Sequence, residues 1–519
     1  MDAKPWYAIA KNELFSRSLI WQLQRRYFEE TGFDAWRLGE VPHYITSNPV
    51  IANSYAEIIF TFYREQLAIS PDSQNKLLYI LELGAGPGRF AYHFLARLQW
   101  LCDETGIALN NFRYILTDFT QSNLDFWSSH PYFSPYFENG ILDIALLDIT
   151  SPGTIELQVS GKILTHGSLH LPLVTIANYV FDSVPQELFY IDNNQAYQCL
   201  VSILVNNDGD EVTAAEILAA MQCRYNYQAM DGDIYREAWL QQILNFYTNQ
   251  FNDTHLLFPA DGLKCLHWLK SISHSGLMLL TADKGNHRLE ALANTPLPDL
   301  VRHGSLSLTV NYHALKYYCE HHGGTSLFTT HHYHGLNIAC LLMVPDAHLL
   351  KETKLTYKHF IEDFGPDDFY TISKHARKYI GEMGINEILA YLRLSMYDSH
   401  QFSRYLPRIM ELAADIDTNS RSEIKVIIDK IWEQYFPIGE ELDLANALAT
   451  YFYSVDDFEQ ALYYFERSVT VYGHDTGTLC NMAACLLMLG DSPRSKYLLE
   501  QVLEHDPDNE AAKEMLKEI

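Results

Sequence analysis

The segment Tyr79–Phe90 constrains the fold more than any other part of the sequence. An apolar run, Tyr-Ile-Leu-Glu-Leu, leads directly into Gly-Ala-Gly-Pro-Gly, and a stretch with helical spacing of apolar residues follows. Glycines allow positive φ angles and let the backbone approach a ligand closely, and a helix that begins here presents free N–H groups. The pattern Glu-x-Gly-x-Gly-x-Gly therefore predicts a strand, a ligand-binding turn and a helix.

Further apolar runs alternate with helical stretches, as a parallel sheet with crossover helices requires. The expected strands are 77–83, 114–117, 144–147, 173–177 and 277–281. We therefore expect a doubly wound, Rossmann-like α/β domain over residues 76–346. The long segment of about 192–270, between the fourth and fifth strands, has helical periodicity and is expected to be a helical insertion.

The chain of 519 residues exceeds the size of a single hydrophobic core, so several domains are expected. Residues 1–75 are predicted to form an N-terminal helical cap, because the apolar residues from Tyr55 to Tyr63 recur at helical spacing. Residues 347–440 are predicted to form a helical connector, with an amphipathic helix at 425–435.

An internal repeat occupies residues 441–519. Four positions are matched 34 residues later, namely Ala449 by Ala483, Ala461 by Ser495, Phe465 by Leu499 and Glu466 by Glu500. This period is typical of tetratricopeptide repeats, an all-α architecture. Such a module serves as a docking surface for a protein partner, or as a stabilising or dimerising appendage, which makes a homodimer one possible state.

The composition excludes several classes of function. A formal net charge of −28 argues against nucleic-acid binding, which needs clustered cations. An acidic surface attracts a basic protein segment, or, more commonly, serves only solubility. Eight cysteines without a Cys-x-x-Cys pair suggest neither zinc nor disulfides, and fit a reducing cytoplasm. The N-terminus lacks the apolar core of a signal peptide, and no apolar run approaches the ~20 residues of a membrane helix.

A cluster of histidines at His331, His332 and His334, with His321 and His322 upstream, raises the question of a metal. Imidazoles at alternate positions of a strand share a face, and residues 329–342 are predicted to be a late strand. Because no carboxylate lies between His321 and His334 to complete a familiar ligand set, we expect structural or surface histidines and no metal. The chain also lacks the Gly-x-Ser-x-Gly elbow of many hydrolases.

The glycine turn favours S-adenosylmethionine over a dinucleotide. A dinucleotide fold prefers G-x-G-x-x-G, whereas here the third glycine comes one residue early. Glu82, near the end of the strand, suits the cationic ammonium of the methionine part. The expected cofactor-binding residues of this turn are Glu82, Gly84, Gly86 and Gly88, and the alternative is a glycine-rich turn without a ligand.

Two more strand ends carry candidate cofactor residues. Asp118 ends the second strand, where a carboxylate can accept both ribose hydroxyls. Asp148 and Ile149 close the third strand, where Asp148 could accept from the adenine amino group while Ile149 covers the ring. The alternatives are a helix-capping acid at Asp118 and a turn-forming acid at Asp148.

The fourth strand ends in Asn178-Tyr179-Val180-Phe181-Asp182, at the edge where open α/β sheets bind ligands. Methyl transfer needs a nucleophile aimed at the sulfonium methyl and the removal of a proton, so positioning matters more than covalent catalysis. Asn178 could orient an amine and contact the cofactor, and Asp182 could hold a cationic target. A turn-forming amide and a helix cap are the alternative roles.

Several segments, taken in order, resemble the MidA family of class I methyltransferases, which includes a protein arginine methyltransferase that assembles complex I. The resemblance spans residues 17–343. Tyr44–Pro49 is similar to the family's F-x-T-S-P-E segment, Ala177–Pro185 to A-N-E-x-x-D-A-x-P, and Gly304–Tyr312 to D-L-T-A-H-V-D-F. Tyr179 replaces the family's acid, Ala282–Gly285 replaces I-D-Y-G, and the repeats are additional.

The residues and the resemblance together imply an enzyme that transfers a methyl group from S-adenosylmethionine to a protein side-chain nitrogen, arginine first and lysine second. One alternative is a small-molecule methyltransferase, which an enclosed apolar pocket under the 192–270 insertion would favour. The other is a non-enzymatic assembly or scaffold protein that binds partners through its repeats.

Overall fold

The computed structural model describes residues 6–69, 76–151, 153–206, 212–333, 335–440 and 442–519. The chain forms two compact units, residues 1–372 and 373–519. Among the described residues, no helix is both long and apolar enough to cross a membrane.

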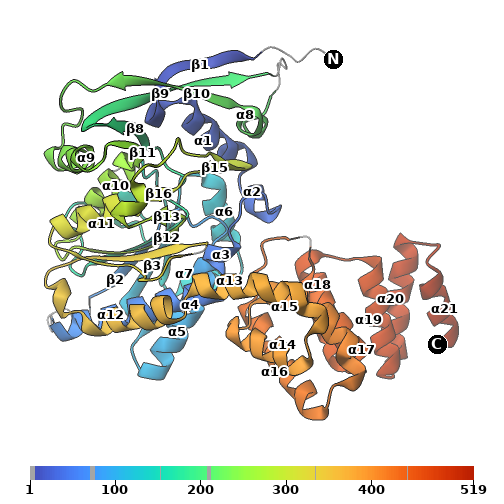
Figure 1. Cartoon of the computed structure of the whole chain (residues 1–519). Helices are drawn as coiled ribbons and strands as arrows, with labels where there is room; N and C mark the ends of the chain where they lie inside the picture. Colours follow the sequence, from blue (N-terminus) through green and yellow to red (C-terminus); the bar gives the residue numbers. More distant parts are fainter. Residues whose placement is uncertain (1–5, 70–75, 152, 207–211, 334, 441) are drawn as a thin grey trace. The chain divides into compact units, whose positions relative to one another are not determined.

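A seven-stranded sheet forms the centre of the first unit (Figure 1). Its strands are β2 (Leu78–Glu82), β3 (Phe112–Asp118), β4 (Leu142–Leu146), β7 (Leu173–Asn178), β12 (Leu277–Asp283), β17 (Thr325–Leu327) and β18 (Asn337–Met343). They lie in the order β17-β18-β12-β7-β2-β3-β4, and β18 runs antiparallel to both its neighbours while β12, β7, β2, β3 and β4 are parallel. This arrangement confirms the doubly wound, Rossmann-like α/β class expected for a class I methyltransferase fold.

All five strands expected from the sequence lie in this sheet. Their side chains are buried on both faces, as in β2 and β12, where every residue is buried. Strands covered on both sides read as continuous apolar runs, which is why the sequence located them well.

The late strand is shorter than the expected 329–342, because β18 begins only at Asn337. The backbone N–H groups of Gly335 and Leu336 donate to Asp367 Oδ1 at 2.7 and 2.9 Å instead of to a neighbouring strand. His331 and His332 therefore precede the strand, and His332 Nε2 lies 3.2 Å from Arg288 Nη1; His334 lies outside the described residues. Within the described ranges no group of three His, Cys, Asp or Glu side chains is arranged to hold a metal ion.

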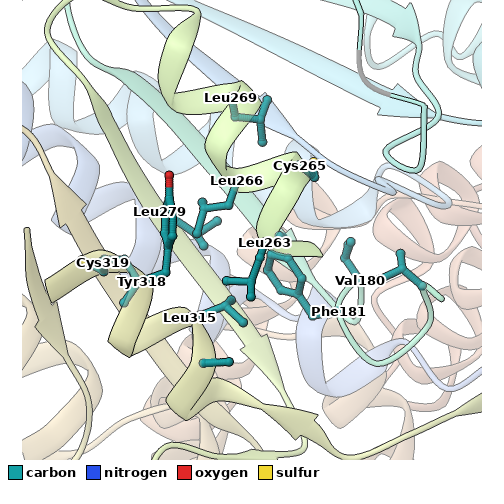
Figure 2. Close-up of a cluster of buried hydrophobic side chains, with 14 of the residues drawn as sticks. Val180, Phe181, Leu263, Cys265, Leu266, Leu269, Leu279, Leu315, Tyr318 and Cys319 are labelled. Carbon is teal, nitrogen blue, oxygen red and sulfur yellow. The ribbon is translucent and has the colours of Figure 1, made fainter. Parts of the chain in front are cut away.

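Helices cover the sheet on both faces (Figure 1). On one side lie α4 (Pro49–Ile69), α5 (Arg89–Thr105) and α12 (Lys351–Tyr357), and on the other α9 (Ala238–Gln250), α10 (Ala260–Ser271) and α11 (Tyr312–His321). Figure 2 shows the second interface, where Leu263 and Leu266 of α10 and Leu315 of α11 meet Leu279 of β12. Burying each such leucine contributes about 1.5–3 kcal/mol, so this layer anchors the strand ends firmly.

A second, smaller sheet corrects the helical predictions for residues 1–75 and 192–270. It is built from β1 (Tyr7–Leu14), β8 (Glu187–Asp192), β9 (Gln195–Val205), β10 (Gln222–Ala229) and β11 (Asp253–Phe258). Cys199, Val201 and Ile203 of β9 are buried on one face, which is the period of two typical of a strand. The helices α8 (Ala214–Ala220), α9 and α10 in the same segment produced the helical periodicity that concealed it.

Of the remaining N-terminal helices, the first two pack against this second sheet, and the third contacts the helices α4 and α5 of the first sheet. The three helices are α1 (Leu19–Thr31), α2 (Asp34–Arg37) and α3 (Tyr44–Ser47). Short elements complete the unit: β5 (Ile155–Glu156), β6 (Ile163–Leu164), β13 (Gly285–Asn286), β14 (Val301–His303), β15 (Ser305–Ser307), β16 (Val310–Asn311), α6 (Gln121–Ser129) and α7 (Ser134–Glu138).

The second unit is helical, and α13 (Pro366–Ala376) leads into it along the chain. Its helices are α14 (Ile385–Leu394), α15 (Ser399–Leu412), α16 (Thr418–Gln434), α17 (Leu444–Ser454), α18 (Phe458–Tyr472), α19 (Thr476–Met488), α20 (Ser492–His505) and α21 (Glu510–Glu518). The predicted helix at 425–435 falls within α16 apart from its last residue. Three of the four repeated pairs are buried, namely Ala449 and Ala483, Ala461 and Ser495, and Phe465 and Leu499.

Candidate functional site

A cavity of about 400 Å³ opens at the carboxyl ends of β2, β3, β4 and β7. Ligand pockets typically have volumes of roughly 300–1,000 Å³, so the cavity can hold a nucleoside-sized ligand. Eight of the nine residues predicted from the sequence line it: Glu82, Gly84, Gly86, Asp118, Asp148, Ile149, Asn178 and Asp182. The sequence therefore identified one connected site from residues as far apart as 82 and 182.

Gly88 is the predicted residue that does not line the cavity. It adopts a φ of 77°, and a Cβ atom there would lie 3.0 Å from the ring of Phe133 and 3.2 Å from that of Trp127. Gly88 is thus needed for close packing at the start of α5. Gly86, with a φ of 52°, does line the cavity, but a Cβ atom on it would meet the ring of Trp36 at 3.2 Å.

Glu82 is 5% exposed and lies at the end of β2. Tyr114 donates a hydrogen bond to its Oε2 at 2.8 Å. Burial raises the pKa of Glu82 to about 8, although the bond from Tyr114 favours the charged form. The carboxyl group is therefore mainly protonated at neutral pH until a cation approaches it.

Asp118 is buried at the end of β3 and holds the turn that follows. Its Oδ1 accepts from the backbone N–H of Thr120 at 3.0 Å and from the Thr120 hydroxyl at 2.9 Å. Burial raises the pKa of Asp118 despite these bonds. Asp118 thus stabilises the turn after β3, and it also lines the cavity.

Asp148 is held by two neighbours at the end of β4. Thr150 donates to Oδ1 through its backbone N–H at 2.9 Å and its hydroxyl at 2.6 Å, and Arg25 of α1 forms an ion pair with Oδ2. Burial alone would raise the pKa of Asp148, but these bonds outweigh it and lower the pKa. The Arg25 guanidinium also lies 5.0 Å from the ring centre of Phe119, so it caps this end of the cavity.

Asn178 and Tyr179 end β7 in an unusual conformation. The Asn178 Oδ1 accepts from the Tyr55 hydroxyl at 3.1 Å, whereas its Nδ2 is buried without a hydrogen-bond partner among the described residues. Tyr179 adopts a φ of 54°, which costs a residue with a side chain of order 1–3 kcal/mol. Backbone strain such as that at Tyr179 persists where the surrounding structure fixes the conformation of a site. The unpaired Nδ2 donor of Asn178 could bind an acceptor atom of a ligand.

Asp182, which lines the cavity, forms an interacting acid pair with Asp283, which is buried outside the cavity lining. Burial, and then the charge of Asp182, raise the pKa of Asp283 well above the ordinary value, and burial also raises the pKa of Asp182. Phe181 N donates to Asp283 Oδ2 at 3.3 Å, and Ser183 donates to Asp182 Oδ1 at 2.7 Å. Two buried carboxyl groups in contact retain a proton, so the pair can accept one more from a substrate.

Further polar or aromatic lining residues that were not predicted as site residues include Arg25, Trp36, His43, Arg89, Lys284, His303, Ser305 and Ser307. Lys284 directly follows the strand end at Asp283, so the rule that ligands bind at the carboxyl ends of parallel strands could have found it. Arg25, Trp36 and His43 carry no local signal, because only the folding of the N-terminal helices brings them to the cavity. His303 lies 3.2 Å from the hydroxyls of both Ser305 and Ser307.

Comparisons with known proteins give limited matches. No protein-family model matches the chain, and no curated protein sequence gives a significant match. One similar solved structure is an uncharacterized COG1565 superfamily protein from Burkholderia thailandensis, with 16% identity, a TM-score of 0.38, and coverage of 62% of this chain and 74% of that chain.

A second similar structure, from the same organism, is described as a "COG1565 superfamily member and likely methyl transferase" bound to S-adenosyl-homocysteine. Its identity is also 16%, its TM-score is 0.39, and the coverage of the two chains is again 62% and 74%. Because both TM-scores are below 0.5 and the identities are low, the function of this chain is inferred from its own cavity.

Proposed function

We propose that the chain is an S-adenosylmethionine-dependent methyltransferase of the MidA-like type. The observation that carries the proposal is that Glu82, Asp118 and the glycine turn, each expected separately for this cofactor, line one cavity at the carboxyl edge of the sheet. A domain that served only as a scaffold would have no physical need for two buried acids there.

The chemistry of the cavity fits the cofactor part by part. Glu82 would pair with the ammonium of the methionine part, and ionise as it does so. Asp118 would accept the ribose hydroxyls, and Ile149 would cover the adenine ring. Asp148 would receive the adenine amino group while it remains paired with Arg25, so its contribution to affinity is expected to be small.

When bound, the cofactor supplies an electrophilic methyl group on a sulfonium. The chain's own residues then have to orient a nucleophile and take its proton. Asp182 lines the cavity and, backed by Asp283, accepts a proton from a cationic nitrogen and attracts its charge. The free Nδ2 donor of Asn178 holds an acceptor of the ligand in place.

The substrate we propose is a protein side-chain nitrogen, arginine first and lysine second, in keeping with the acid pair and the MidA-like motifs. Residues 76–346 would form the catalytic domain, 1–75 its N-terminal cap, 347–440 a connector and 441–519 tetratricopeptide-like repeats. The repeats would bind the protein substrate or partner, or join two copies of the chain. The proposed compartment is the cytoplasm.

Two alternatives make different predictions. An enclosed apolar pocket under residues 192–270 favours a small-molecule methyltransferase. None of the described residues lining the large cavity belongs to that segment, and the cavity that Trp239 and Ile243 border there measures only about 140 Å³. Opposite the strand ends, the large cavity is lined instead by residues of α1, α2, α3 and the β14–β15 hairpin. A non-enzymatic scaffold protein would neither bind S-adenosylmethionine nor transfer its methyl group.

The test uses methyl-labelled S-adenosylmethionine, the purified chain and a fractionated protein extract, with Asp182→Asn as the matched inactive variant. Label in methylarginine or methyllysine of a protein, dependent on Asp182, supports the proposal. Label only in the small-molecule fraction supports the first alternative. No transfer, together with no binding of S-adenosylmethionine in calorimetry, supports the scaffold.

A further inference from the structure

Arg89 is a cavity-lining cation next to the glycine turn, and no motif in the sequence indicated a role for it. It is the first residue of α5 and lies half-buried in the wall of the cavity. The free N–H groups at the start of a helix add positive potential there. A guanidinium and a helix N-terminus therefore follow the glycine turn, and the acid Glu82 precedes this turn in the lining of the same cavity.

A neutral histidine orients Arg89. His43 Nδ1 lies 3.3 Å from the carbonyl oxygen of Val41, and because a carbonyl only accepts, Nδ1 carries the proton. The other ring nitrogen, Nε2, is then an acceptor, and Arg89 Nη1 donates to it at 3.5 Å. Burial, and next the charge of Arg89, lower the pKa of His43 to about 4, so the acceptor stays neutral at physiological pH.

The backbone around His43 is itself fixed. The hydroxyls of Thr46 and Ser47 donate to the His43 carbonyl oxygen at 3.2 and 2.8 Å, and both residues line the cavity. All three lining cations have partners: Arg25 pairs with Asp148, the charge of Lys284 lowers the pKa of Asp182, and Arg89 contacts His43. Of the three cations, Arg89 is the one placed beside the glycine turn.

We propose that Arg89, held by His43, binds the carboxylate of the cofactor's methionine part, so that Glu82 and Arg89 together recognise its two opposite charges. This inference rests on the proposed function, because it takes the ligand to be S-adenosylmethionine. Arginine suits the task, since its planar guanidinium donates two parallel hydrogen bonds to a carboxylate. The ammonium and the carboxylate share one carbon atom, so their binding groups have to be neighbours.

The experiment compares two ligands that differ only in this carboxylate, S-adenosylmethionine and decarboxylated S-adenosylmethionine, by calorimetric titration of the full chain. The wild type is expected to bind the first at least about tenfold more tightly. Arg89→Gln should lower the affinity for S-adenosylmethionine by roughly ten- to a hundredfold. The affinity for the decarboxylated ligand should stay unchanged or rise slightly. Arg89→Lys should recover part of the loss, because it keeps the charge without the paired donors.

Arg25→Gln is the matched control, since it removes a second guanidinium from the same cavity and should affect both ligands alike. His43→Leu should also weaken the binding of S-adenosylmethionine more than that of the decarboxylated ligand, but by a smaller factor than Arg89→Gln. Equal losses for both ligands in Arg89→Gln, or a wild type that does not distinguish them, would overturn the assignment. A wild type that binds neither ligand would refute the proposed function and the assignment with it.

Discussion

Binding of S-adenosylmethionine should release a proton from Glu82. The carboxyl group is buried at the end of β2, and burial raises its pKa to about 8. It is therefore mostly protonated at pH 7, but it must be ionised to pair with the ammonium of the ligand. Because the ionised fraction grows as the pH approaches this pKa, the affinity should rise with pH.

The size of the effect follows from this pKa. Between pH 6 and pH 7 the ionised fraction of such a group rises about ninefold, and the association constant should rise with it. At pH 7 each ligand bound should release about 0.9 proton. Above pH 7.5 or so the α-amino group of the ligand begins to lose its own proton, so the lower window is the informative one.

Calorimetry in two buffers of different ionisation enthalpy measures both the affinity and the released proton. Glu82→Gln is the control that removes the group, so the difference between the two proteins isolates Glu82 from Asp118 and Asp182. Tyr114→Phe removes the hydrogen bond that lowers the pKa of Glu82, and should move the affinity profile to higher pH. Proton release of the same size in wild type and Glu82→Gln, or an affinity independent of pH, would refute the reasoning.

Three further predictions concern other parts of the chain. Asp182→Asn should lower the rate of methyl transfer at least ~100-fold, while the dissociation constant for S-adenosylmethionine stays nearly unchanged. Labelled transfer assays and calorimetry measure these two quantities, and an unaltered rate of transfer would contradict the prediction. Gly86→Val should lower the free energy of unfolding by about 1–3 kcal/mol in thermal denaturation, because Gly86 has a φ of 52° and its Cβ would meet Trp36; adding Trp36→Ala should recover only the steric part. Ala483→Leu, at a fully buried position of α19, should destabilise the second unit by about 1–3 kcal/mol without changing cofactor affinity; a loss of affinity would be the contradicting result.

The sequence predicted the central sheet because its signals are local. Each buried strand appears as a run of apolar residues, and the acids at the strand ends follow those runs directly in the chain. Since the carboxyl ends of parallel strands meet at one edge, Glu82, Asp118, Asp148 and Asn178 could be assembled into one site from the order of the strands alone.

The rest of the site depends on contacts between distant segments. The pairing of β1 with β9 joins residues 7–14 to residues 200–205, and nothing in either segment alone specifies its partner. Arg25, Trp36 and His43 reach the cavity only because α1 packs on that second sheet. Similarly, Asp182 was predicted as a site residue but Asp283 was not, because Asp283 matters through its interaction with the carboxyl group of Asp182.

The most direct test of the account is a crystal structure of the chain grown with saturating S-adenosyl-homocysteine. The account predicts the ligand in the cavity at the carboxyl edge of the sheet, with its ribose hydroxyls on Asp118, its ammonium on Glu82 and its carboxylate on Arg89. A cavity that stays empty at saturation, or a ligand bound elsewhere on the chain, would contradict the claim that this site binds the cofactor.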